Sequence, residues 1–133
     1  SDLKRFFLPP TPMQPLVLQM EKTATKLNYQ IYIAADLYYL QGHFDNFPII
    51  PGVTQINWAI ELALQNFFIP NKFYQMTNIK FKRVIRPGTV LNLILQRDIV
   101  KDSIAFSFEN AVDKFSSGII KFKVAYETAT HGI

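Results

Sequence analysis

One stretch of the sequence, residues 53–68, has the hydrophobic spacing of an α-helix and is flanked on both sides by segments with β-strand spacing. Within it, apolar side chains recur at helical intervals at Ile56, Ile60, Ala63 and Phe67. Most of the remaining positions are apolar as well, so this helix is expected to be buried on most of its sides. Pro70 lies just beyond the stretch and ends the helix.

Strand-type alternation of apolar and polar residues marks much of the remaining chain. It occurs at residues 27–33, 79–82, 91–96, 104–108 and 120–126. Turns are expected at residues 86–88 and 101–102, and a loop around Ser116-Ser117-Gly118. Because the later segments are close in sequence, an antiparallel meander is the economical arrangement. The sequence therefore predicts an α+β fold in which an antiparallel sheet of five to six strands wraps around one long buried helix.

The size and composition of the chain restrict its class. Its 133 residues predict a single domain, with residues 1–15 as an extended lead-in and residues 127–133 as a flexible tail. The sequence contains no cysteine, which excludes thiolate zinc sites and suits a reducing cytoplasm. A formal charge of +4 is too small to indicate nucleic-acid binding, and no apolar run is long enough for a membrane span. Because 49% of the residues are apolar, part of the surface is expected to be buried against another subunit.

A histidine precedes the predicted helix in a loop rich in proline and glycine. His43 belongs to residues 42–53, which run through Pro51 and Gly52 into the helix. Proline fixes φ and glycine permits close backbone approach, so this pair predicts a defined turn at the helix start. The N-terminus of a helix presents N–H groups and partial positive charge, which suit a developing oxyanion. A base beside such a site indicates chemistry at a carbonyl group.

The residues around His43 resemble the active-site signature of an enzyme family. Residues 42–44 (Gly-His-Phe) and 47–53 (Phe-Pro-Ile-Ile-Pro-Gly-Val) are similar to the signature of 3-hydroxyacyl-[acyl carrier protein] dehydratases of the FabA/FabZ type, which have the hot-dog fold. Residues 53–59 and 79–83 resemble the ApeI-like branch, which is associated with aryl-polyene clusters. The resemblance covers roughly residues 15–126 and implies a hot-dog fold for the whole domain.

The resemblance also implies a role for several residues. His43 would take the α-proton of a 3-hydroxyacyl thioester, while the Gly52 N–H polarises the thioester carbonyl. In the family no metal or cofactor takes part, and the histidine and an acid come from different subunits of a homodimer. The acyl chain is expected to contact the signature and the helix at Phe44, Phe47, Pro48, Ile50, Pro51, Val53 and Trp58. Trp58 is also an ordinary candidate for the core.

An acyl carrier protein is the implied partner. Such carriers are acidic and deliver the substrate on a phosphopantetheine arm, so a basic rim at the substrate entrance would attract them. Lys82, Arg83 and Arg86 follow one predicted strand and its turn, and they are the candidates for this contact. Alternation alone also explains exposed lysines on a strand.

The chain departs from the family at the acid position, fourteen residues after His43, where it has Asn57. An amide can orient a hydroxyl group but cannot act as a general acid, and general acid–base catalysis typically contributes about 10²–10⁴-fold in rate. Glu61, one helical turn further on the same face, could supply the proton. Alternatively, the chain binds acyl thioesters without turnover, or Asn57 is a deliberate replacement that traps substrate. A hot-dog thioesterase, in which Asn57 or Glu61 positions water, is a further alternative.

Overall fold

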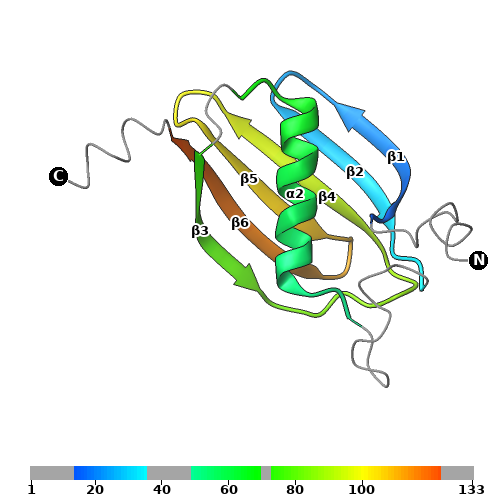
Figure 1. Cartoon of the computed structure of the whole chain (residues 1–133). Coiled ribbons are helices and arrows are strands. Elements are labelled where there is room, and N and C mark those ends of the chain that lie inside the picture. Colours follow the sequence, from blue (N-terminus) through cyan, green and yellow to red (C-terminus); the bar gives the residue numbers. More distant parts are fainter. Residues whose placement is uncertain (1–13, 36–48, 70–72, 124–133) are drawn as a thin grey trace, which may run out of the picture.

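The computed structural model describes residues 14–35, 49–69 and 73–123. Their elements follow the order β1 (Leu16–Lys22), β2 (Lys26–Tyr32), α2 (Gly52–Asn66), β3 (Phe73–Phe81), β4 (Val90–Asp98), β5 (Ser103–Glu109) and β6 (Lys114–Lys123). The six strands form one antiparallel sheet in the order β1-β2-β4-β5-β6-β3. Figure 1 shows α2 lying across one face of this sheet, which curves around it.

The core lies between α2 and the sheet face that it crosses. The predicted alternation of the central strands is confirmed, because the inward positions are buried at Leu27, Tyr29 and Ile31 of β2, Leu91, Leu93 and Leu95 of β4, and Ile104, Phe106 and Phe108 of β5. The helix contributes Ile56, Ala59, Ile60 and Ala63 to the same core. Burial of each large apolar side chain contributes roughly 1.5–3 kcal/mol, so this layer holds helix and sheet together. The predicted α+β architecture with one helix is confirmed.

The helix is buried on fewer sides than its composition predicts. Val53 is 70% exposed and Leu64 is 46% exposed, and Asn57 and Glu61 are also exposed. These positions are separated by three or four residues, so they form one stripe along α2. A single sheet covers only one side of a helix, which leaves this stripe outside the core of the chain.

The prediction of a loop around Ser116-Ser117-Gly118 is wrong, because these residues lie inside β6. Ser116 and Gly118 occupy inward positions of that strand and are buried. A Cβ atom on Gly118 would lie 2.6 Å from Cε2 of Phe106, its neighbour on β5, so the strand has room only for glycine there. Strand β1 was not predicted separately, because Leu16, Val17 and Leu18 are consecutive apolar residues and hide the period of two.

Some expectations lie outside the described residues. They are the lead-in up to residue 13, the strand positions Val124 and Tyr126, and the tail 127–133. Within the ranges that the structure describes, no helix is long and apolar enough to cross a membrane.

Candidate active site

The junction between the preceding loop and α2 is held by hydrogen bonds from two directions. The N–H of Ile50 donates to the carbonyl of Ile85 (2.9 Å), and the side-chain amide of Gln55 donates to the carbonyl of Ile50 (3.1 Å). Pro51 is extended, with φ −59° and ψ 149°, and its carbonyl accepts the backbone N–H of Gln55 (3.2 Å). The predicted helix start is confirmed, since α2 begins at Gly52.

Gly52 lies in close contact with the ring of Phe81, the last residue of β3. A Cβ atom on Gly52 would lie 2.6 Å from Cζ of that ring, so the close approach depends on glycine. The N–H groups of Gly52 and Val53 open the first helical turn and have no acceptor within the helix itself, whereas the Thr54 N–H donates to the carbonyl of Pro51 (3.1 Å). The partial positive charge of the helix N-terminus adds to their attraction for a negative oxygen.

A buried polar pair connects this junction with β6. Gln55 is 3% exposed and Ser116 is 1% exposed, and the Ser116 hydroxyl donates to Oε1 of Gln55 (2.6 Å). The two ends of the Gln55 amide therefore hold the carbonyl of Ile50 and the hydroxyl of Ser116. Neither residue was among the site residues predicted from the sequence. The available signal was a glutamine at an inward position of a largely apolar helix.

A cavity of about 340 Å³ opens at this junction, within the size range of small-molecule sites. It is lined by Ile49, Ile50, Pro51, Gly52, Gln55, Phe81, Lys82, Arg83 and Val84. The structure thus brings together five of the predicted site residues, namely Ile50, Pro51, Gly52, Lys82 and Arg83. They come from the start of α2 and from the segment that follows β3, which are about 30 positions apart in the sequence.

The basic residues lie on the rim of this cavity. Lys82 is exposed, and Nε of Arg83 pairs with Oδ1 of Asp113 (3.0 Å) while its side chain remains 66% exposed. An exposed ion pair of this kind contributes little to stability and leaves the arginine accessible to a partner. Arg86 is exposed as well and lies three residues beyond Arg83, outside the cavity lining.

Four predicted residues of α2 are not among the described residues that line the cavity. Val53 and Asn57 lie on the exposed stripe of the helix. Trp58 is buried and packs against Phe108, with ring centroids 6.5 Å apart. Glu61 is exposed, and its Oε2 accepts a hydrogen bond from the side-chain amide of Gln14 (2.9 Å).

The remaining predicted residues, His43, Phe44, Phe47 and Pro48, lie outside the described residues, so their roles stay predictions. His43 precedes Ile49, a cavity residue, by six positions. In the described part of the chain, no three His, Cys, Asp or Glu residues lie together as a metal site.

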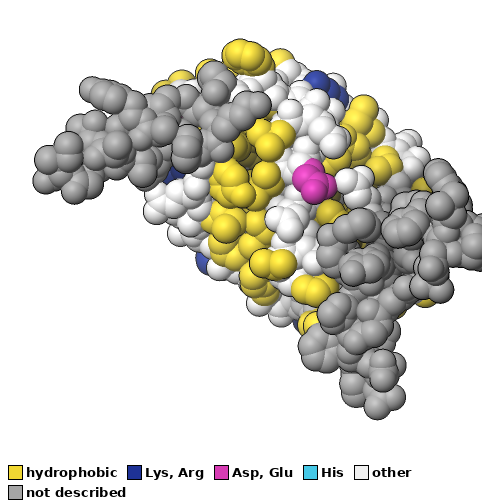
Figure 2. Space-filling model, viewed as in Figure 1, with side chains coloured by type: hydrophobic (Ala, Val, Ile, Leu, Met, Phe, Trp, Pro, Cys, Tyr) yellow, Lys and Arg dark blue, Asp and Glu magenta, His cyan; other side chains and the backbone are white. Residues whose placement is uncertain are grey.

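An apolar surface combines part of the exposed stripe of α2 with the neighbouring strand β3. It consists of Val53 and Leu64 on the helix with Tyr74, Met76 and Phe81 on β3, all of which are exposed, and we call it the α2–β3 patch. Figure 2 shows hydrophobic side chains gathered in a band on this side of the molecule. Among the described strands β3 is at an edge of the sheet, so one side of its backbone has no strand partner there.

Several known proteins similar to this chain are dehydratases. The model of the ApeI-like family, described as ApeI dehydratase, matches residues 19–119. The chain is 34% identical over 79 residues to the 3-hydroxyacyl-[acyl-carrier-protein] dehydratase FabZ of Natranaerobius thermophilus, an alignment that covers 54% of this chain and 56% of the relative. It is 30% identical over 92 residues to FabZ of Fusobacterium nucleatum, covering 64% of each chain. The chain therefore spans less than two thirds of the length of these relatives.

Solved structures support the same assignment of fold and family. A chain of the dehydratase heterocomplex ApeI:P from Xenorhabdus doucetiae superposes with a TM-score of 0.76 at 28% identity, covering 82% of this chain and 97% of that one. The dehydratase domain of the CurK module of curacin polyketide synthase has a TM-score of 0.60 at 14% identity, covering 92% of this chain and 48% of that one, and shares the fold. This chain has a hot-dog fold, a helix that begins at a glycine in the wall of a cavity, and a family match over most of its length. It therefore belongs to the ApeI-like family of FabZ-type dehydratases.

Proposed function

We propose that this protein acts on (3R)-3-hydroxyacyl thioesters carried by an acyl carrier protein, and eliminates water to give trans-2-enoyl thioesters. Membership of the ApeI-like family supports the reaction class. The observation that carries the proposal is that α2 begins at Gly52 in the wall of a cavity, directly after the loop that contains His43.

The proposed chemistry follows from these two groups. The thioester carbonyl accepts a hydrogen bond from the Gly52 N–H, which stabilises the enolate that forms when His43 removes the α-proton. The bond from the β-carbon to the hydroxyl group then breaks as the double bond forms. Hydroxide is a poor leaving group, so it departs as water only when a proton is supplied. The hydrogen bonds at Ile50 and Pro51 hold the backbone that leads into Gly52, which supports an N–H group that is preorganised before substrate arrives.

We propose a homodimer as the working unit, formed by the α2–β3 patch and the free edge of β3. Exposed apolar side chains beside an unpaired strand edge are the features of an interaction surface. Asn57 lies between Val53 and Leu64 on the exposed stripe, so a partner bound there would contact it. This agrees with the family pattern, in which the histidine and the residue at position 57 come from different subunits.

Asn57 makes the final proton transfer the weak step of this reaction. Glu61 lies one turn further along the stripe, and its carboxylate is hydrogen-bonded to Gln14 in the described chain. The ApeI relative was solved as a dehydratase heterocomplex. A related subunit with a carboxylic acid at the equivalent position is therefore an alternative partner, and it would supply the proton that Asn57 lacks.

A second candidate function is supported by Asn57 itself. An acyl-thioester-binding subunit needs the cavity and the Gly52 N–H but no general acid. In either function the acidic carrier would approach the rim formed by Lys82 and Arg83, with Arg86 nearby. The lack of cysteine suits a cytoplasmic site of action, where carrier-bound intermediates are expected.

The test is an assay of the purified protein with 3-hydroxyacyl-carrier substrates. A rise in enoyl absorbance supports the dehydratase, whereas release of free thiol would show a thioesterase. Binding of the acyl-carrier without either change would show the non-catalytic subunit. Glu61→Gln in parallel shows whether any observed dehydration uses that carboxylate, and Gln65→Glu, an exposed position on the same helix, is the charge control.

A further inference from the structure

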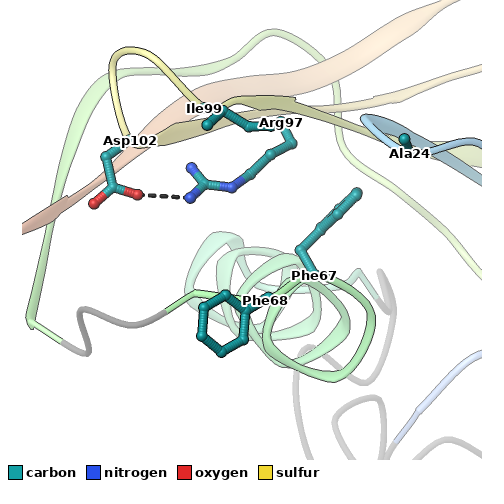
Figure 3. A pocket seen from close by; sticks show the side chains of 6 residues that line it. All are labelled: Ala24, Phe67, Phe68, Arg97, Ile99 and Asp102. Carbon is teal, nitrogen blue, oxygen red and sulfur yellow. Dashed lines mark hydrogen bonds and ion pairs between the residues drawn. The ribbon is translucent and has the colours of Figure 1, made fainter.

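A second cavity, of about 510 Å³, lies at the opposite end of α2 from Gly52. Ala24, Phe67, Phe68, Arg97, Ile99 and Asp102 line it. The fifteen residues of α2 separate the two cavities by about 21 Å along the helix. Figure 3 shows the guanidinium group of Arg97 extending into the space between the sheet and the rings of Phe67 and Phe68.

Arg97 is a charged residue in an apolar row. It follows Leu91, Leu93 and Leu95 on the inward face of β4, and its side chain is only 7% exposed. Burial of a charge is costly unless ion pairs and hydrogen bonds compensate for the lost water. Each N–H donor of a buried arginine is therefore expected to have an acceptor.

The described residues satisfy only part of the guanidinium group. Nη1 donates to the carbonyls of Asp98 and Ser103, each at 3.2 Å, and Nη2 donates to Oδ1 of Asp102 at 2.7 Å. A guanidinium group has five N–H donors. Among the described residues, Nε–H and the second hydrogen of Nη2 have no acceptor. These two donors lie on one edge of the group, the arrangement that binds a carboxylate with two parallel hydrogen bonds.

A second cation borders the cavity in the described part of the chain. Lys22 lies beside it, with Nζ 5.9 Å from the centroid of the Phe67 ring and 2.7 Å from the carbonyl oxygen of Asn66. Asp102 is the one acidic side chain among the described residues that line the cavity. Among the described residues, the cavity thus has one buried cation, Arg97, a single lining carboxylate, Asp102, and an exposed cation, Lys22, at its border. The attraction of the buried guanidinium group for an anion is stronger than in open water.

The walls opposite the guanidinium group are apolar. Phe67 is buried, whereas Phe68 is 89% exposed and Ile99 is 69% exposed at the rim. Exposed aromatic and aliphatic side chains beside a charged anchor are the usual composition of a site for an amphipathic small molecule.

We propose that this cavity binds a small carboxylic acid with an aliphatic or aromatic body. Its carboxylate accepts hydrogen bonds from Nε and Nη2 of Arg97, and its body lies against Phe67, Phe68 and Ile99. The proposal does not depend on dehydratase activity at Gly52.

The test is a titration of the protein with hexanoate, followed by the side-chain Nε–H signal of Arg97 in ¹H–¹⁵N NMR spectra. Saturable binding that shifts this signal is expected, and hexanol, which has the same chain without the charge, should bind at least about tenfold more weakly, since charge-assisted hydrogen bonds are roughly twice as strong as neutral ones. Phe68→Ala should weaken hexanoate binding about tenfold through lost apolar contact, and it should not affect folding because Phe68 is exposed. Phe81→Ala, the same truncation in the Gly52 cavity, should leave hexanoate affinity unchanged.

Three results would overturn the proposal. The first is no shift of the Arg97 signal at millimolar hexanoate. The second is hexanol binding as tightly as hexanoate, since the anion would then play no part. The third is a loss of hexanoate affinity in Phe81→Ala but not in Phe68→Ala, which would place the ligand in the other cavity.

Discussion

The hydroxyl of Ser116 donates a hydrogen bond to Oε1 of Gln55 across 2.6 Å, and both side chains are buried. Ser116 lies near the start of β6, and through this bond it fixes the Gln55 side chain, whose amide donates to the carbonyl of Ile50. The backbone that leads into Gly52 is therefore fixed by the core of the sheet. Such a buried network rigidifies its surroundings when every member is satisfied.

Replacement of Ser116 by alanine should destabilise the fold. The change leaves Oε1 of Gln55 buried without its donor, which costs roughly 1–3 kcal/mol. Urea unfolding should show a lower midpoint with an unchanged slope, because the surface exposed on unfolding stays the same. Ser117→Ala, a change of the neighbouring serine on the opposite face of β6, is the control and should alter stability by less than about 0.5 kcal/mol. Equal stabilities of the two variants would contradict this account.

The two crowded glycines should differ in their tolerance of alanine. At Gly118 a new methyl group would meet Cδ1 of Ile79 and also the ring of Phe106, which is 2% exposed and fixed in the core, so Gly118→Ala should cost roughly 1–3 kcal/mol. At Gly52 it would meet the far end of the Phe81 ring, which is 51% exposed and can turn aside. Gly52→Ala should therefore be the milder change in thermal unfolding, and the reverse order would show that Phe81 is held in place.

Local sequence patterns correctly predicted the strands whose inward positions are all apolar. They did not predict strand positions at which the residue type depends on a contact with a residue far away in the sequence. Leu91, Leu93 and Leu95 keep the period of two because one face of β4 meets the core. In β6 the inward row includes Ser116, which pairs with Gln55, and Gly118, which makes room for Phe106. Both causes lie on other elements, so the segment has the composition of a loop.

In the candidate site, too, the features that depend on local sequence were predicted, and those that depend on distant contacts were not. Proline and glycine chemistry is local, and it correctly placed the start of α2 at Pro51-Gly52. The part that Phe81 plays at Gly52 depends on how β3 pairs with β6, which one sequence does not reveal. Apolar composition indicated that α2 is covered on most sides. It could not say that one side, with Asn57 and Leu64, would be left exposed.

Asn57→Asp should raise the rate of dehydration. A carboxylic acid at this position can protonate the departing hydroxyl group, and such catalysis typically contributes about 10²–10⁴-fold. The gain should appear in kcat measured by enoyl absorbance, with little change in carrier affinity, because Asn57 is not among the described residues that line the cavity with Lys82. An unchanged rate would mean that another group already supplies the proton, and loss of activity in Glu61→Gln would identify that group.

Met76→Lys should weaken dimer formation. Met76 lies on β3 within the α2–β3 patch, and burial of an unpaired ammonium group in an interface is unfavourable. Sedimentation should show dissociation at concentrations where the unmodified protein is a dimer, and activity should recover as the concentration rises if the site is shared. Gln75→Lys, on the opposite face of the same strand, is the charge control. An unmodified protein that is monomeric throughout would contradict the homodimer and favour the related-subunit partner.

The role of the Gly52 N–H can be isolated because proline is compatible with this position. Proline lacks an N–H group but fits the first residue of a helix, and Pro51 already has the extended conformation that a residue before proline prefers. Phe81→Ala removes the ring that either new side chain would meet. In an Asn57→Asp background, we therefore compare Gly52→Pro with Gly52→Ala, each combined with Phe81→Ala.

The two variants differ chiefly in the presence of one N–H group. Loss of a single donor from an oxyanion site costs about 10²–10³-fold in kcat, so the proline variant should fall below the alanine variant by that factor. Circular dichroism should show equal helix content and similar melting, which excludes a folding defect as the cause. Equal kcat values for the two variants would mean that the thioester carbonyl does not bind at the start of α2, and the proposed mechanism would be wrong.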